Sequence, residues 1–215
     1  MMQVLDLFAG SRSMSKAAIA NGCKAFSTDL HHFDGIDYPC DILMIDVNQL
    51  PDQIDMVWAS PPCTGFSVAA IGHHWTGGKG AYIPKTETAK LGIQLLKETI
   101  RLIEFLQPKV WFIENPRGLM RKMPELEKYN RYTVTYCQYG DTRMKPTDIW
   151  TNSKTWQPRP MCKNGSPCHD AAPRGSRTGT QGLKGNYERS KIPSDLCDEI
   201  IKSAKKECNE PRRVF

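Results

Sequence analysis

The chain has 215 residues, a mass of 24.3 kDa and a formal net charge of +6, a size that suits one compact domain. With 40% hydrophobic and 24% charged residues and no apolar run of about 20 residues, the composition excludes a disordered chain and a membrane protein. The first residues lack the basic and apolar stretches of a signal peptide, so we expect a cytoplasmic protein with reduced cysteines.

The charge is distributed unevenly along the chain. Residues 1–115 carry a net charge of −3, and residues 116–215 carry +9. Basic surface supplies the salt-dependent part of nucleic-acid binding, so the second half is the expected polyanion-binding face. A solvated basic surface that serves only solubility is the alternative.

Strands alternate with short helices over the first 60 residues, which indicates a parallel α/β sheet. A long amphipathic helix, with apolar residues at helical spacing, is predicted over residues 85–106. A shorter helix is predicted over residues 14–20 and a last one over 195–207. The predicted strands cover residues 4–8, 23–29, 42–47, 54–60, 110–114, 132–136 and 148–151.

The pattern suggests three parts. Residues 1–155 are expected to form the main α/β domain, which also carries the candidate catalytic residues described below, and residues 192–215 a helix that returns to it, followed by a basic tail. Between them, residues 156–191 are basic and rich in glycine and proline, so we expect an irregular insertion that could recognise DNA.

Polar residues stand at the carboxyl ends of the predicted strands, where open parallel sheets bind ligands. Gly10 closes the first strand in a tight turn after Asp6. Asp29 follows that glycine by about 20 residues, where a ribose diol is bound in nucleotide-binding folds. Asp46 could accept a hydrogen bond from an adenine amino group. Solvated turn carboxylates are the alternative for both aspartates.

A thiol and a carboxylate stand at two neighbouring strand ends. Pro61 and Pro62 stiffen the backbone before Cys63, which makes this cysteine a candidate nucleophile, although an inert buried cysteine remains an alternative. Glu114 closes the next buried strand and should lie at the same sheet edge. Burial there would raise its pKa, so that it could hold or donate a proton. A helix-capping acid is the alternative.

Residues 6–10, 62–67 and 114–116 resemble, in order, three motifs of the DNA cytosine-5 methyltransferases. The resemblance covers about the first 150 residues and implies a Rossmann-like α/β fold that uses S-adenosylmethionine. Residues 6–10 resemble the loop around the methionine part of that cofactor. The cofactor-binding residues that the resemblance implies are Asp6, Phe8, Ala9, Gly10, Asp29, Asp46 and Val47.

The same resemblance implies the chemistry. The Cys63 thiolate attacks C6 of cytosine, which makes C5 nucleophilic enough to take a methyl group. Glu114 in its acid form holds N3, and Arg143 or Lys145 binds O2. The expected catalytic residues are therefore Cys63, Glu114 and Arg143. The reaction needs both faces of the base, so the cytosine must flip out of the duplex.

Several positions depart from the family pattern. Arg12 and Ser13 replace a glycine, and Lys145 stands where a second arginine is usual. The chain has no room for a large target-recognition domain, so it resembles compact phage- or prophage-encoded members. Residues 190–196 faintly resemble the family's last motif, where the chain returns to the cofactor. We expect a monomer that binds DNA and no membrane.

The remaining cysteines and histidines carry weaker signals. Cys162, Cys168 and His169 could bind zinc, but a fourth ligand is not obvious in the sequence, so no metal site is predicted. His73, His74 and Trp75 either fold over the nucleophile or are ordinary loop residues. The cysteines expected to serve only in packing are Cys23, Cys40, Cys137, Cys197 and Cys208.

Other functions stay open at this point. An exocyclic-amino methyltransferase, which modifies N4 of cytosine or N6 of adenine, shares the residues 60–62 but needs an aromatic residue where Cys63 stands. C5 methylation of cytosine in RNA would use the same chemistry. A catalytically silent nucleic-acid-binding module would leave Cys63 and Glu114 without a role.

Overall fold

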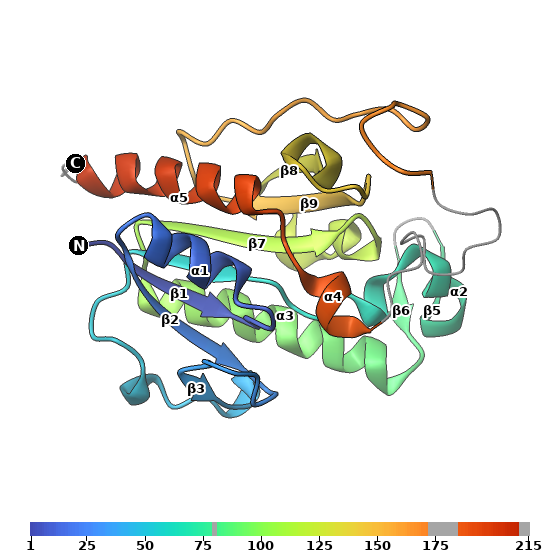
Figure 1. The fold of residues 1–215 in the computed structure, drawn as a ribbon. Coiled ribbons are helices and arrows are strands. Elements are labelled where there is room, and N and C mark those ends of the chain that lie inside the picture. Colours follow the sequence, from blue (N-terminus) through green and yellow to red (C-terminus); the bar gives the residue numbers. More distant parts are fainter. Residues whose placement is uncertain (79–80, 172–184, 211–215) are drawn as a thin grey trace.

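The computed structural model describes residues 1–78, 81–171 and 185–210, and a seven-stranded sheet runs through its centre (Figure 1). The strand order is β3-β2-β1-β4-β7-β9-β8. The first five of these strands are parallel, and β9 is antiparallel to both of its neighbours. The strands of this sheet are β1 (Gln3–Leu7), β2 (Lys24–Asp29), β3 (Tyr38–Pro39), β4 (Met56–Ala59), β7 (Val110–Pro116), β8 (Asn130–Thr135) and β9 (Pro146–Thr151).

Helices cover both faces of the sheet, which gives three layers (Figure 1). Helix α3 (Glu87–Leu106) packs its apolar stripe on one face. On the other face, α1 (Ser13–Ala20) packs beside α5 (Ser194–Asn209), whose buried side chains join the core there. Because the strands bury side chains on both faces, they read as continuous apolar runs in the sequence.

The predicted α/β class with a mostly parallel sheet is confirmed. Six predicted strands and three predicted helices are present, with boundaries shifted by a few residues. The strand predicted over residues 42–47 is wrong. That stretch forms two short 3₁₀ helices, because the side chains of Asp41 and Asp46 accept hydrogen bonds from the backbone N–H groups of Leu43 and Asn48. The short β3 takes the place of that strand beside β2.

Shorter elements lie mainly in the connections. A small hairpin and helix α2 follow the loop that carries Cys63, and α4 precedes the last helix. These elements are α2 (Ile71–His74), β5 (Trp75–Thr76), β6 (Ile83–Pro84) and α4 (Asn186–Ser190). The 3₁₀ helices are η1 (Ile42–Met44), η2 (Val47–Gln49), η3 (Thr64–Phe66), η4 (Val68–Ala70), η5 (Leu119–Lys122), η6 (Pro124–Leu126) and η7 (Tyr136–Tyr139).

The beginning of the predicted insertion is held against the domain. Arg159 donates a backbone hydrogen bond to the hydroxyl of Tyr139, and its side chain bonds the Gln138 carbonyl and the Glu199 carboxylate. Trp156 is buried in the core beneath α5. The expectation of an irregular stretch therefore holds for residues 156–171, but α4 adds regular structure near its end; residues 172–184 lie outside the described residues.

None of the helices in the described part of the chain combines the length and the apolar character that crossing a bilayer requires.

Candidate active site

Cys63 lies on an exposed loop directly beyond the carboxyl end of β4. Its carbonyl accepts a hydrogen bond from Phe66 N (2.9 Å), which forms the first turn of η3. The side-chain amide of Asn115, at the end of β7, donates to the Pro61 carbonyl over 2.8 Å. This bond joins the cysteine loop to the strand that carries the neighbouring carboxylate.

Glu114 lies on β7 at the same sheet edge and is buried, with 5% of its surface exposed. The Tyr136 hydroxyl donates a hydrogen bond to Glu114 Oε1 over 3.0 Å. Burial raises the pKa of Glu114, and the nearby charge of Lys145 and the hydrogen bonds of Tyr136 and Ser60 lower it in part. Its acid form is therefore favoured more than that of an exposed glutamate.

The two basic residues after β8 lie in different surroundings. Arg143 is buried, and its guanidinium forms a two-pronged ion pair with the Asp141 carboxylate and also donates to the Lys191 carbonyl. Lys145 lies over the Tyr136 ring, 4.6 Å from its centroid. Burial lowers the pKa of Lys145, and Glu114 and Cys63 are among the acidic groups that raise it. Lys145, not Arg143, is thus the cation close to the predicted catalytic pair.

The loop between β1 and α1 has an unusual backbone. Phe8, Gly10 and Arg12 all adopt left-handed conformations, with φ of 58°, 47° and 58°. Only glycine adopts this region without cost, so Phe8 and Arg12 are held there by the surrounding structure. Ala9 is buried, and its N–H donates to the Thr28 carbonyl. This loop therefore lies against the end of β2.

Asp6 and Asp29 hold the β1–α1 loop and the start of α1 in place through hydrogen bonds. Asp6 is buried, and its Oδ2 accepts hydrogen bonds from the backbone N (3.0 Å) and hydroxyl (2.6 Å) of Ser15 in α1. Burial raises the pKa of Asp6 to about 6. Asp29 Oδ2 accepts from Gly10 N over 2.9 Å, and Asp29 Oδ1 accepts from His31 N. Asp29 thus stands at the end of β2, where the sequence predicted a nucleotide-binding carboxylate.

Asp46 and Val47 lie at the start of a 3₁₀ helix and not at the end of a strand. With no strand over residues 42–47, Asp46 is an exposed residue that caps η2, and Val47 packs partly on the core in the first turn of that helix. Tyr38 of β3 links this segment to the sheet, because its hydroxyl accepts a hydrogen bond from Asp46 N over 3.5 Å.

The chain returns to this loop near its end, through the residues that resemble the family's last motif. Ile192 N donates to the Ser13 hydroxyl over 3.2 Å. A Cβ on Gly10 would lie 3.5 Å from the Ser190 hydroxyl, so α4 directly faces the β1–α1 loop. Tyr187 of α4 packs its ring on Phe33, with centroids 5.7 Å apart.

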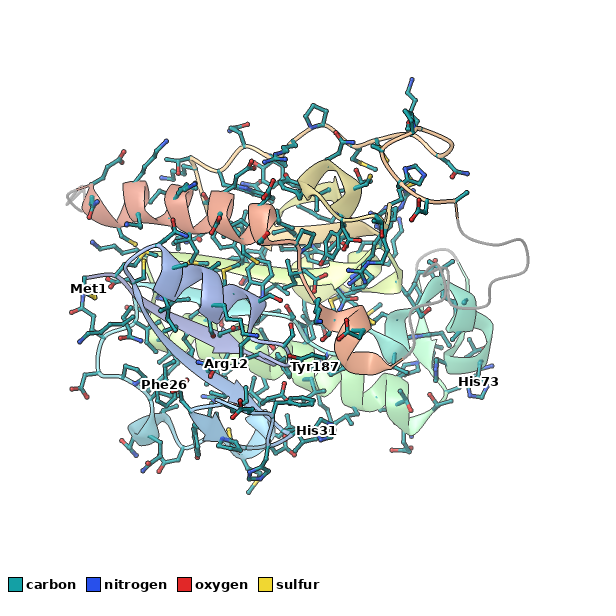
Figure 2. The ribbon with its side chains drawn as sticks, viewed as in Figure 1. Met1, Arg12, Phe26, His31, His73 and Tyr187 are labelled. Atoms are coloured by element: carbon teal, nitrogen blue, oxygen red, sulfur yellow. The ribbon has the colours of Figure 1, made fainter. Side chains whose placement is uncertain are left out.

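The side chains of His73, His74 and Trp75, which follow the cysteine loop, differ in burial. Trp75 is buried and donates from Nε1 to the Gly65 carbonyl over 2.6 Å, and His74 Nδ1 lies 2.7 Å from the Thr86 hydroxyl. Trp75 thus supports the cysteine loop, and His74 contacts the residue that caps the start of α3. His73 is exposed and lies at the outer end of the molecule (Figure 2).

Two features of this region have no clear signal in the sequence. Tyr136 ends a predicted strand, and only the pairing of β7 with β9 and of β9 with β8 brings it to Glu114. Cys137, expected to serve in packing, lies beside Cys162, Cys168 and His169. Hydrophobic periodicity along the sequence reveals neither feature, because both depend on contacts between distant segments.

Comparison with known proteins identifies the family. The model of the C-5 cytosine-specific DNA methylase family matches residues 38–133. A Frog virus 3 (isolate Goorha) protein described as a DNA (cytosine-5)-methyltransferase is 31% identical over 216 residues, which cover 93% of this chain and 99% of the viral protein. This similarity extends well beyond the three motifs.

Solved structures share the fold. An E. coli prophage protein described as a DNA modification methyltransferase superposes with a TM-score of 0.53 at 15% identity, over 75% of this chain and 52% of that one. The Entamoeba histolytica methyltransferase EhMeth gives 0.52 at 13% identity, over 76% and 57%. The chain thus spans little more than half the length of these two structures. From the viral relative and the family model together, the chain belongs to the family of C5-specific cytosine DNA methyltransferases.

Proposed function

We propose that this protein transfers a methyl group from S-adenosylmethionine to C5 of cytosine in DNA, through a covalent bond between Cys63 Sγ and C6 of the base. The observation that carries this proposal is the convergence of Cys63 and Glu114 at one sheet edge, joined by the 2.8 Å hydrogen bond from Asn115 to Pro61. The exposed thiol is accessible to a base that has left its duplex.

The residues at the sheet edge suit the cofactor. Arg12 Nε is buried and has no hydrogen-bond partner among the described residues, so a carboxylate such as that of the cofactor's methionine part would satisfy it. Asp29 and the left-handed loop at residues 8–12 would hold the nucleoside and methionine parts. When bound, S-adenosylmethionine supplies an electrophilic methyl group on a sulfonium.

The protein's own residues then act on the base. The Cys63 thiolate forms the bond to C6, and the electron pair of the C5–C6 double bond moves toward C5. Glu114 in its acid form donates a hydrogen bond to N3, where negative charge develops. After C5 has taken the methyl group, which would leave the cofactor as a neutral thioether, loss of the C5 proton to solvent expels the Cys63 thiolate and restores the aromatic ring.

Lys145 supplies the positive charge near the base in this proposal. Its ammonium group is buried beside Tyr136 and close to Glu114 and Cys63, so it is suited to interact with cytosine O2. Arg143 positions the loop, because its guanidinium is already bound to Asp141 and to the Lys191 carbonyl.

Residues 156–191 are the proposed DNA-facing segment. Their net charge is +5, whereas residues 192–215 carry no net charge, and α4 brings the end of the segment to the cofactor loop. A segment this short would read a short target sequence, and the enzyme would act as a monomer, with one duplex bound per chain.

A trapping experiment tests this function. Duplex DNA with 5-fluorocytosine should form a covalent complex with the wild-type protein when S-adenosylmethionine is present, because fluorine cannot leave as a proton does. Cys63→Ala should form no complex and still bind the cofactor, and Cys208→Ala, a cysteine remote from the sheet edge, should form it normally.

Other outcomes would contradict the proposal. Methyl transfer by Cys63→Ala would exclude covalent catalysis, and methylation of an exocyclic amino group without a trapped complex would favour the other class of DNA methyltransferase. A complex formed with 5-fluorocytosine RNA but not with DNA would change the substrate.

A further inference from the structure

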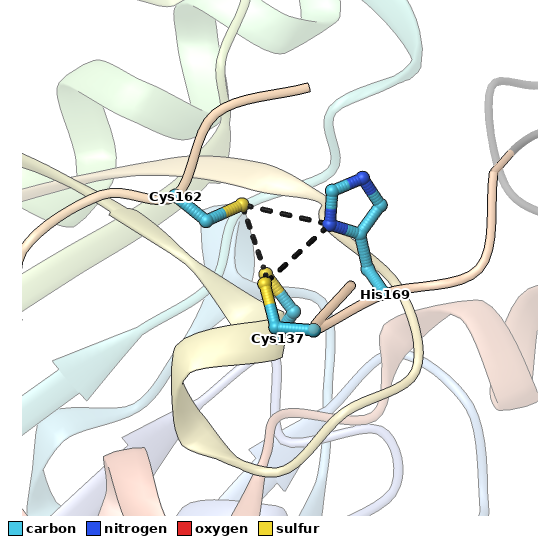
Figure 3. A group of neighbouring side chains, drawn as sticks. Cys137, Cys162 and His169 are labelled. Atoms are coloured by element: carbon cyan, nitrogen blue, oxygen red, sulfur yellow. Dashed lines mark hydrogen bonds between the residues drawn. The ribbon is translucent and has the colours of Figure 1, made fainter. Parts of the chain in front are cut away.

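Four metal-binding side chains meet at the end of β8, away from the predicted catalytic pair. Cys137, Cys162, Cys168 and His169 each offer one ligand atom, and all four atoms lie within 4.8 Å of one another. Figure 3 shows the sulfur atoms of Cys137 and Cys162 and the Nδ1 edge of the His169 ring facing one another. Cys137 comes from η7, and the other three come from the predicted insertion.

The distances suit a tetrahedral site. With zinc–sulfur bonds of about 2.3 Å and zinc–nitrogen bonds of about 2.0 Å, the edges of the tetrahedron are about 3.8 Å between sulfurs and about 3.5 Å from sulfur to nitrogen. Here Cys168 Sγ lies 3.7 Å from Cys137 Sγ, and His169 Nδ1 lies 3.7 Å from Cys162 Sγ and 3.6 Å from Cys168 Sγ. The Cys137–Cys162 edge, at 3.1 Å, must lengthen, and the two remaining edges are no longer than 4.8 Å.

We propose that Cys137, Cys162, Cys168 and His169 bind one structural Zn²⁺ ion. Three thiolates with one imidazole are a common ligand set for structural zinc, and four protein ligands leave no open position for catalysis. Thiols are weak hydrogen-bonding groups, so three of them with an imidazole gain little from meeting unless a metal ion holds them. The inference does not depend on the methyl-transfer reaction.

The charges of the site balance with the loss of protons. Cysteine binds zinc as the thiolate and histidine as the neutral ring, so the three thiols release their protons when zinc enters. The complex then has a net charge of −1. Gln138 Nε2 donates to Cys168 Sγ over 3.4 Å, which stabilises the negative sulfur.

The backbone around the four ligands is already fixed. Cys162 N donates to the Thr135 hydroxyl at the end of β8 over 3.0 Å. Asp170 N, next to His169, donates to the Thr142 carbonyl over 2.9 Å. Ligands held in this way need little rearrangement, which favours binding.

The site would connect two functional regions. Cys137 follows Tyr136, whose hydroxyl bonds Glu114, and the other ligands lie in the segment proposed to face DNA. The zinc ion would therefore fix the basic segment to the turn that supports the catalytic carboxylate. Zinc binding would supply folding free energy to the insertion in place of a hydrophobic core of its own.

The test begins with the wild-type protein, purified without chelator from cells supplied with zinc. We expect about one zinc ion per chain by elemental analysis, and X-ray absorption at the zinc edge that fits three sulfur ligands and one nitrogen ligand. Cobalt substitution should give the intense visible bands of a tetrahedral thiolate site. None of these measurements requires methyltransferase activity.

Matched variants assign the ligands. Cys162→Ser and Cys168→Ser should lower the zinc content at least tenfold, and Cys208→Ser, outside the cluster, should keep it. His169→Ala should weaken zinc retention against a chelator, and His169→Cys should restore it, because a fourth thiolate also completes a zinc site.

Two results would overturn the proposal. The first is wild-type protein that is folded by circular dichroism yet holds less than about a tenth of a zinc ion per chain after supplementation. The second is a Cys137–Cys162 disulfide in protein alkylated without reduction, since an oxidised pair could not bind the ion. Full zinc content in Cys168→Ser would likewise remove that residue from the site.

Discussion

Two buried carboxylates, Asp6 and Glu114, have raised pKa values for the same main reason, desolvation, but their neighbours give them different roles. Asp6 Oδ2 accepts two hydrogen bonds from Ser15 of α1, so Asp6 fixes the start of that helix. Glu114 lies close to the charge of Lys145 and at the edge where the base would bind. The first is a structural acid and the second is the proposed catalytic one.

The pairing of Glu114 with Lys145 predicts a pH effect. If the acid form of Glu114 is active, the single-turnover rate of methyl transfer falls as pH rises through its pKa. Lys145 lowers that pKa, so Lys145→Met should raise it and move the alkaline limb of the rate profile to higher pH. Glu114→Gln should remove the limb and slow the reaction by about 10² or more. A limb that stays in place in Lys145→Met would refute the coupling.

The environment of Asp6 predicts an effect on stability. Its pKa is about 6 in the folded protein against 3.8 for the free group, so the folded state binds more protons between these values and stability falls as pH rises through them. At pH 7 this costs about 3 kcal/mol. Asp6→Asn should remove the loss, because the amide oxygen can still accept from Ser15.

Urea unfolding at pH 4.5 and pH 7 measures this effect. Between pH 4.5 and pH 7 the free energy of unfolding of Asp6→Asn should fall by less than that of the wild type, because the contribution of Asp6 is removed and that of Glu114 remains, and Asp52→Asn, an exposed carboxylate, should follow the wild type. A variant that is equally destabilised at both values would show that the carboxylate itself is needed.

At the scale of the elements, the loop that carries Cys63 depends on close packing of backbone against backbone. A Cβ on Gly118, after β7, would lie 2.4 Å from the Phe66 carbonyl oxygen, a distance that real contacts do not reach. The absence of a side chain there lets the turn after Glu114 lie directly on η3. The two strand ends that carry the proposed catalytic residues are thus held together by a glycine and by the Asn115 amide.

Gly118→Ala should therefore disturb both stability and catalysis. We expect a loss of roughly 1–3 kcal/mol in the free energy of unfolding, as for other overpacked sites, and slower trapping by 5-fluorocytosine DNA because the Cys63 loop must shift. Gly72→Ala is the matched control, since its Cβ would meet nothing within 4 Å. Equal behaviour of the two variants in thermal unfolding and trapping would show that the loop yields without cost.

The elements also show where local pattern suffices and where it does not. The buried strands β1, β4 and β7 are predictable because their apolar runs are short and bounded by turns. Residues 42–47 have the same apolar character, yet they form 3₁₀ turns, because two aspartate side chains accept hydrogen bonds from nearby backbone N–H groups. Side-chain capping of this kind competes with a strand and leaves the hydrophobic pattern unchanged.

At the scale of the whole molecule, the sheet brings together residues that the sequence separates. Cys63 and Glu114 could be placed at one edge beforehand, because parallel strands end on the same side. The positions of Tyr136, Lys145 and Cys137 could not, since they depend on β9 entering the sheet in the opposite direction between β7 and β8.

The uneven charge of the molecule predicts how it binds DNA. Each phosphate contact releases counterions, so the logarithm of the binding constant should fall steeply and linearly with the logarithm of salt concentration. Lys163 is exposed in the proposed DNA-facing segment, and Lys24 is exposed at the opposite end of the sheet. Lys163→Gln should reduce the salt slope by about 1 and weaken binding to all sequences alike.

The control for this measurement is Lys24→Gln, which changes the net charge equally but should leave the slope as in the wild type, because it lies where strands begin. Fluorescence anisotropy of a labelled duplex between low and moderate salt gives both slopes, and the zinc content of each variant shows whether the neighbouring cysteine cluster is intact. If the two variants lose the same slope, the net charge of the molecule attracts DNA and residues 156–191 make no particular contact with its phosphates. If only Lys163→Gln does, the segment that follows β9 lies on the backbone of the duplex, on the side of the sheet where Cys63 must reach the flipped base.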